Sequence, residues 1–162
     1  MIEHFSIEPY EHGHRLTQVQ LIEQPLSEVW EFFSNAENLQ RLTPAFLKFK
    51  ILTPCPIEMR VGALIDYRIS LFGVPMTWKT EITEYTPKKH FVDNQIKGPY
   101  ARWHHTHRFE EVPGGTRMTD EVEYRVPMGA LGSMAHGLFV RRTLGQIFAF
   151  RGQAVAEVFG AA

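Results

Sequence analysis

The chain has 162 residues, of which 44% are hydrophobic and 22% charged, and its formal net charge at pH 7 is -1. These values are typical of a soluble globular protein of ordinary domain size, so we expect a single domain over residues 1–162. The near-neutral charge gives no electrostatic reason to expect nucleic acid or an anionic membrane as a partner.

The cysteine content and the lack of long apolar stretches indicate in which cellular compartment we expect the protein. Cys55 is the only cysteine, so one chain can form neither an internal disulfide nor a cluster of thiolate metal ligands. The first residues lack a basic segment followed by an apolar run, and no segment is apolar over the about 18 residues that a membrane-spanning helix needs. We therefore expect a cytoplasmic protein that is neither exported nor inserted into a membrane.

The first predicted elements are a strand and two short helices. Residues 14–24 alternate in the way of a strand, and Pro25 ends the pattern. The apolar period then changes to that of an amphipathic helix, at Leu26, Val29, Trp30 and Phe33. Ser34 and Glu37 have the spacing of a capping box, which predicts a second short helix that ends before Pro44.

The middle of the chain predicts an antiparallel meander. Alternating segments are separated by short turns rich in proline and glycine, and they cover residues 47–53, 63–72, 76–85, 90–97, 100–112 and 116–126. Since a parallel crossover needs a dozen or more residues, segments joined by such short turns must be antiparallel neighbours.

The tail predicts one long helix over residues 133–159, with an apolar face and no proline. Gly145 and Gly152 suggest close packing of this helix against the sheet, and we expect Arg141, Arg142 and Arg151 on its solvated face. The predicted fold is therefore α+β: a curved antiparallel sheet of about six or seven strands wraps around the long C-terminal helix.

This order of elements resembles the helix-grip fold of the START-like superfamily, also called SRPBCC or birch-pollen-allergen-like. Four stretches are more narrowly similar to uncharacterised bacterial ligand-binding SRPBCC domain proteins: residues 29–44, 61–82, 91–110 and 114–129. The resemblance covers nearly the whole chain and implies a cavity between sheet and helix. It leaves ligand and reaction open, because the superfamily includes lipid and hormone carriers, polyketide cyclases and oxygenase domains that carry mononuclear iron.

Alternation also predicts which side chains face that cavity. Within "ARWHHTHRFEE", residues 101–111, the inward set is Trp103, His105, His107 and Phe109, so His104 faces outward. In residues 116–126, Met118 and Asp120 fall on the inward face, where Asp120 is the one carboxylate. In residues 90–97 the pattern fits either Phe91, Asp93 and Gln95 or their neighbours as the inward set, so this register stays open.

Three interpretations suit the polar group formed by His105, His107 and Asp120. The residues satisfy one another or trapped water in a polar interior. Alternatively, they hold the polar end of a small apolar or amphipathic molecule. The third interpretation is a metal site or a metal-free acid–base site of cyclase or dehydratase type, with these three residues as catalytic candidates.

We favour recognition of a small hydrophobic or amphipathic molecule, in a cavity of a few hundred Å³. His-x-His alone is a weak metal motif and resembles none known for this subfamily, so no metal or cofactor is expected. The expected ligand-binding residues are Tyr67, Trp78, Trp103, His105, His107, Phe109, Met118, Asp120 and Phe148.

Overall fold

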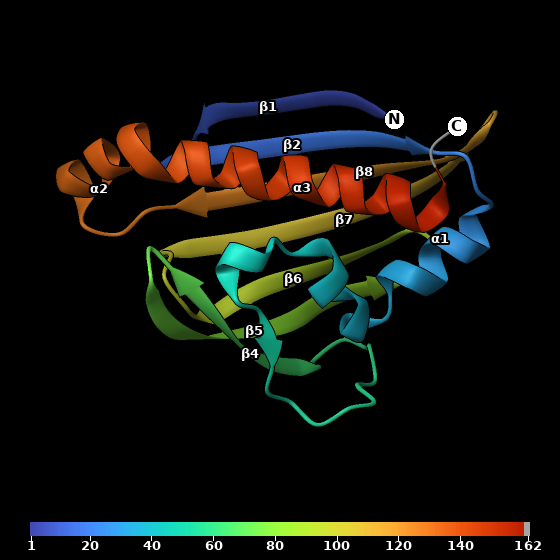
Figure 1. Ribbon diagram of the computed structural model, residues 1–162, viewed down its shortest axis with the longest axis horizontal. Coiled ribbons are helices and arrows are strands. Elements are labelled where there is room, and N and C mark those ends of the chain that lie inside the picture. The colour runs from blue at the N-terminus through green and yellow to red at the C-terminus, as the bar shows by residue number, and fades with distance from the viewer. Residues whose placement is uncertain (161–162) are drawn as a thin grey trace.

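An eight-stranded antiparallel sheet forms the frame of the fold, and one long helix runs along it (Figure 1). The structure is a computed structural model and describes residues 1–160. The strand order is β1-β2-β8-β7-β6-β5-β4-β3. The strands are β1 (Ile2–Tyr10), β2 (Gly13–Ile22), β3 (Lys50–Ile51), β4 (Leu64–Leu71), β5 (Val74–Thr86), β6 (His90–Lys97), β7 (Arg102–Val112) and β8 (Gly115–Arg125).

The helical segments follow β2 and close the chain. Between β2 and β3 lie α1 (Leu26–Phe33) and two 3₁₀ segments, η1 (Ala36–Leu42) and η2 (Ala45–Leu47). After β8 come α2 (Gly129–Ala135), a π-helical turn η3 (His136–Val140) and α3 (Arg141–Phe159). No described helix has both the length and the apolar character needed to cross a bilayer. The predicted α+β helix-grip architecture is confirmed.

The sheet has more strands than the sequence pattern predicts. β1 pairs with β2 at the sheet edge, and of its side chains only Ile7 is buried, so it carries little of the alternation that marks a strand. β3 is much shorter than the predicted strand over residues 47–53. Its start is displaced by η2 and by Lys48, which has a left-handed φ of 47°.

The second short helix begins one residue later than the capping-box pattern predicts. Ser34 ends α1, and the Asn35 side chain accepts a hydrogen bond of 3.0 Å from the backbone N–H of Glu37. Asn35 therefore caps η1, as asparagine favours at this position.

Glutamine side chains of β2 attach α3 to the sheet. Nε2 of Gln18 donates to the Phe148 carbonyl at 3.1 Å, and Nε2 of Gln20 donates to the Gly152 carbonyl at 3.0 Å. A Cβ atom on Gly152 would lie 2.5 Å from Ile2 Cδ1 and 3.3 Å from Gln18 Nε2. The close packing predicted for Gly152 is thus confirmed, whereas a Cβ atom on Gly145 would meet nothing within 4 Å.

Candidate functional site

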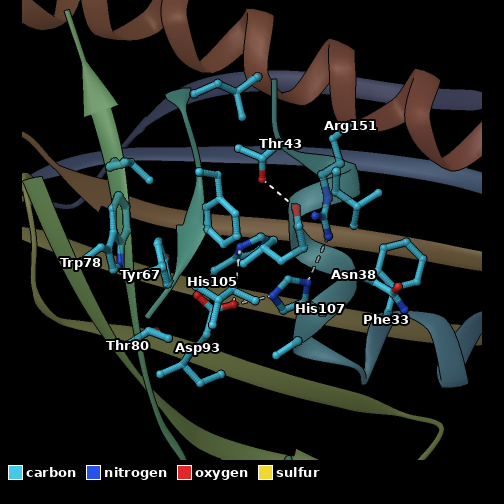
Figure 2. Close-up of a pocket in the computed structure, with 18 of the residues that line it drawn as sticks. Phe33, Asn38, Thr43, Tyr67, Trp78, Thr80, Asp93, His105, His107 and Arg151 are labelled. Carbon is cyan, nitrogen blue, oxygen red and sulfur yellow. Dashed lines mark hydrogen bonds and ion pairs between the residues drawn. The ribbon is translucent and has the colours of Figure 1, made fainter. Parts of the chain in front are cut away.

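A cavity of about 180 Å³ lies between the sheet, η1 and α3 (Figure 2). It is smaller than the few hundred Å³ expected from the sequence. Its aromatic lining consists of Phe32, Phe33, Phe49, Tyr67, Trp78, Phe91, Tyr100, Trp103 and Phe148. Its charged and imidazole groups are Asp93, His105, His107 and Arg151. The cavity is therefore apolar over most of its wall and strongly polar at one place.

Six of the nine residues predicted from the sequence line this cavity: Tyr67, Trp78, Trp103, His105, His107 and Phe148. The other three are buried elsewhere. Phe109 and Met118 belong to the core cluster under α1, where the Phe109 ring lies 5.3 Å from that of Trp30. They share the inward face of their strands, but α1 covers that part of the sheet. Asp120 lies beside the histidines and not among the cavity-lining residues.

The inward register of β6 is that of Phe91, Asp93 and Gln95. Asp93 lines the cavity, and Phe91 stacks on His107 with ring centroids 4.2 Å apart. The sequence pattern of β6 is ambiguous because Val92, on the other face, is also buried. Gln95 braces the next loop through two hydrogen bonds with the backbone of Tyr100.

Five buried or half-buried residues form what we call the polar cluster: Asp93, His105, His107, Asp120 and Arg151. Strand pairing places Asp93 opposite His105 and Asp120 opposite His107, so each carboxylate also reaches the other histidine diagonally. Asp93 Oδ2 lies 2.6 Å from His107 Nε2 and 3.7 Å from His105 Nδ1. Asp120 Oδ1 lies 2.8 Å from His105 Nε2 and 3.1 Å from His107 Nδ1.

Arg151 joins the polar cluster from α3, contrary to its predicted place on a solvated helix face. It is 6% exposed, and Figure 2 shows its side chain reaching from α3 toward His107. The helical period contained a signal for this position. Arg151 lies three residues after Phe148 and four before Val155, both of which are buried.

Burial and charge act in opposite directions on these groups. Burial alone would raise the pKa of Asp120, but the Arg151 guanidinium and the hydrogen bonds from both histidines hold that pKa well below its ordinary value. Burial lowers the pKa of His105, and the charge of His107 adds to this. For His107, the two flanking carboxylates outweigh burial and raise the pKa. The two carboxylates therefore favour a positive charge on His107 over one on His105, and Arg151 supplies a further positive charge beside Asp120.

The other end of the cavity is a cluster of aromatic side chains. Trp78 stacks on Tyr67 with ring centroids 5.7 Å apart and meets Trp103 edge to face at 5.3 Å. The indole N–H of Trp78 is buried and has no hydrogen-bond partner among the described residues. A buried donor without a partner costs about 1–3 kcal/mol, so an acceptor on a bound molecule would be stabilising at this position.

This arrangement suits two kinds of chemistry. The aromatic end can bury the body of a small molecule, while the imidazole and carboxylate groups can hydrogen-bond its polar end. His105 is oriented by Asp120 and faces the cavity, and an imidazole in that situation can also accept a proton.

Comparisons with known proteins agree with this architecture. The model of the family described as polyketide cyclase / dehydrase and lipid transport matches residues 22–150. A solved protein of Rhodobacter sphaeroides is 17% identical with a TM-score of 0.68, and one of Mycobacterium smegmatis is 14% identical with a TM-score of 0.67. In both cases 98% of this chain and 99% of the other are covered. These likenesses show the fold expected from the START-like resemblance.

A third similar structure is larger. It is a nucleoside-diphosphate sugar epimerase of Corynebacterium glutamicum, 25% identical with a TM-score of 0.63, and the match covers 88% of this chain but 28% of the epimerase. No curated protein matches the sequence. The family match extends over most of the chain, from the end of β2 into α3. The chain belongs to the polyketide cyclase/dehydrase and lipid transport family.

Proposed function

We propose that the protein binds a small hydrophobic or amphipathic molecule in the cavity between the sheet and α3. The observation that carries this proposal is that four residues of the polar cluster, Asp93, His105, His107 and Arg151, lie in the wall of a largely apolar cavity. Buried charges without a role are costly, and a few convergent polar groups in an apolar pocket are typical of ligand sites. The exposed free thiol of Cys55 is compatible with a reducing compartment such as the cytoplasm.

The cavity volume narrows the ligand class. Since a site for one water needs about 10–15 Å³, the 180 Å³ cavity has room for on the order of ten waters, or for a molecule with a similar number of non-hydrogen atoms. This favours a compact ring compound over a long-chain lipid. Its rings would lie against Tyr67, Trp78 and Trp103, and its polar end would reach Asp93 and the histidines.

Native mass spectrometry of freshly purified, untagged protein tests the proposal. We expect a mass difference that matches a compact organic molecule and disappears on denaturation. Substituting Ile65, which lines the cavity, with Phe should fill part of the volume and abolish that mass difference. A matched Ile7→Phe variant, altered in the core outside the cavity lining, should retain it. Retention of the molecule by the Ile65→Phe variant would contradict binding in this cavity.

We place ligand access between η3 and the β4–β5 turn. Leu138 and Phe139 on η3 and Phe72 on the turn are exposed, and the rings of Phe72 and Phe139 meet at 6.1 Å. Apolar side chains that meet at an exposed contact can separate to admit a ligand. A Phe139→Ala variant should therefore release the co-purified molecule several-fold faster in stopped-flow dilution. An unchanged release rate would exclude this route.

A lyase of the cyclase or dehydratase type is the second candidate. It is favoured by His105, whose Nε2 is 2.8 Å from Asp120 and whose pKa burial lowers, so that it is an unprotonated base facing the cavity. A compact β-hydroxyketone would be the substrate to test, by following formation of the conjugated enone in absorbance. Turnover that a His105→Gln variant loses while still binding the substrate would support an enzyme. Binding without turnover by the unaltered protein would favour a carrier.

A further inference from the structure

Three potential metal ligands meet at the wall of the cavity. The Asp93 carboxylate lies on β6, while the His105 and His107 imidazoles lie side by side on β7 (Figure 2). One ligand atom from each residue falls within 4.8 Å of the other two. Asp93 Oδ2 is 2.6 Å from His107 Nε2 and 3.7 Å from His105 Nδ1. Two imidazoles and one carboxylate form a ligand set that suits zinc and ferrous iron.

The remaining nitrogen of each imidazole faces Asp120. His105 Nε2 and His107 Nδ1 lie 2.8 and 3.1 Å from the same oxygen, Asp120 Oδ1. Arg151 fixes that carboxylate through Nε to Oδ2 and Nη2 to Oδ1, both at 3.1 Å. A metal-binding histidine almost always donates its other ring N–H to a carboxylate, carbonyl or water, which fixes its tautomer and orientation. One carboxylate serves both histidines in this way.

Tautomers in which both rings donate to Asp120 would leave three electron pairs around one position. When Asp120 accepts an N–H from each ring, the free lone pairs belong to His105 Nδ1 and His107 Nε2, and both face the negative Asp93. Acceptors turned toward each other repel unless a cation lies between them. The geometry therefore calls for a positive charge among Asp93, His105 and His107.

We propose that Asp93, His105 and His107 bind one divalent first-row transition metal ion, zinc or ferrous iron, with open coordination positions toward the cavity. Asp120 is then a positioning residue on the opposite side of both rings and not a ligand. Bonds of about 2.0–2.2 Å to nitrogen and oxygen require ligand atoms roughly 3–3.5 Å apart. The separations of 2.6 and 3.7 Å come within that range after shifts below 1 Å.

A proton is the competing occupant. One proton shared between His107 and Asp93 would also balance the charge, and the protein would then bind no metal there. Metal titration separates the two. Metal titration needs no organic ligand, so failure to bind a metal would leave the proposed binding of a small molecule in the cavity untouched. Failure to find a bound small molecule would likewise leave the metal site untouched.

The experiment uses untagged, chelator-treated protein titrated with Zn²⁺, and with Fe²⁺ under anaerobic conditions, by calorimetry and elemental analysis. We expect one ion of at least one of these metals per chain. Co²⁺ as a substitute should give a visible absorption band with the same stoichiometry. The Asp93→Asn variant keeps the side-chain shape and should weaken binding by at least about tenfold, and an Asp120→Asn variant by about 10–100-fold.

The matched control is His104→Ala, because His104 is adjacent to the proposed ligand His105 on β7 but faces the other side of the sheet. This variant should bind the metal as the unaltered protein does. Circular dichroism should show that the Asp93→Asn protein is folded. Failure to bind either metal, equal binding by the Asp93→Asn variant, or an equal loss in the His104→Ala variant would overturn the site.

Discussion

Arg151 and Asp120 are 31 residues apart in the chain and form a two-pronged ion pair beneath the cavity. Both hydrogen bonds are 3.1 Å long, and both side chains are almost fully buried. The pair joins α3 to β8 through charge, beside a longer contact of 3.5 Å between Arg151 Nη2 and His107 Nδ1 on β7.

The ion pair predicts a strong asymmetry between removing one charge and removing two. An Arg151→Met substitution should lower the free energy of unfolding by about 3–5 kcal/mol, because Asp120 is left as an uncompensated buried charge. The Arg151→Met/Asp120→Leu double variant should recover part of that loss. Urea denaturation monitored by circular dichroism measures both.

The control is Arg142→Met, since Arg142 is exposed on the same helix and its removal should change stability by less than about 0.5 kcal/mol. A single Arg151 variant as stable as the unaltered protein would show that the ion pair is not formed in solution.

The Trp78 indole N–H has no hydrogen-bond partner in the described part of the chain, so we expect its removal to lower the affinity for a ligand more than it lowers the stability of the fold. Trp78→Phe removes the N–H and some aromatic volume but no protein hydrogen bond, so stability should change by less than about 2 kcal/mol. Affinity for the co-purified molecule should fall about tenfold, which corresponds to one lost hydrogen bond of about 1.4 kcal/mol. Trp30→Phe is the control, because Trp30 lies in the core outside the cavity lining and should leave affinity unchanged. Equal affinity of the Trp78→Phe variant would mean that no ligand acceptor faces this donor.

His136 predicts a loss of stability in mild acid. Its Nε2 is 2.7 Å from the Tyr124 hydroxyl, its ring stacks on His14 at 3.6 Å, and burial, then the charges of His14 and Arg141, lower its pKa to about 4. The unfolded chain binds this proton near pH 6.5. The unfolded state therefore binds more protons between about pH 6.5 and 4, and stability falls as pH falls through that window.

The expected contribution of His136 is on the order of 2–3 kcal/mol between pH 7 and pH 4. To separate this contribution from those of the other titrating groups, the free energy of unfolding is measured between pH 7 and pH 4 for the unaltered protein and for a His136→Gln variant. The variant should show the shallower decline. A His12→Gln variant, altered at an exposed histidine, should follow the unaltered protein, and parallel curves for all three proteins would refute the assignment.

The glutamines of β2 predict that α3 is held through its backbone. Gln20→Met keeps the side-chain volume but loses the hydrogen bond to the Gly152 carbonyl, so unfolding should become easier by about 0.5–1.5 kcal/mol. Hydrogen exchange of α3 amides should accelerate with it. Substituting the exposed Gln153 with Met should alter neither measurement.

Most helices and strands could be predicted from the sequence because they have one solvent-exposed face and one buried face. β2, α1 and β4 to β8 each show the period of their type, so their kind could be assigned, and for β4, β5, β7 and β8 the inward side chains could be assigned as well. β1 escaped prediction because an edge strand with one buried side chain has almost no period. The Asp93 register was undecided because both faces of β6 carry buried residues, Phe91 on one and Val92 on the other.

The candidate site was harder to predict because its key partners come from different elements. His105 and His107 could be placed on one face by alternation alone, but their distances to Asp93 and Asp120 depend on strand order and register, which no local pattern specifies. The prediction for Arg151 was wrong because three arginines on one helix suggested a solvated surface. Its position between Phe148 and Val155 instead places it on the buried face of α3. The local periodicity of the sequence thus predicts which side chains face inward, whereas the pairing of distant strands and helices determines which charged groups come into contact.

The attachment of α3 through main-chain carbonyls has an evolutionary consequence. Gln18 and Gln20 bind main-chain carbonyls, which every amino acid possesses, so these two contacts do not depend on the side chains at the cavity-lining positions of α3. The side chains of α3 that line the cavity are therefore free to vary under selection for a different ligand. These side chains are Leu144, Ile147 and Phe148. A library randomised at these three positions should yield many folded proteins that differ in what they bind.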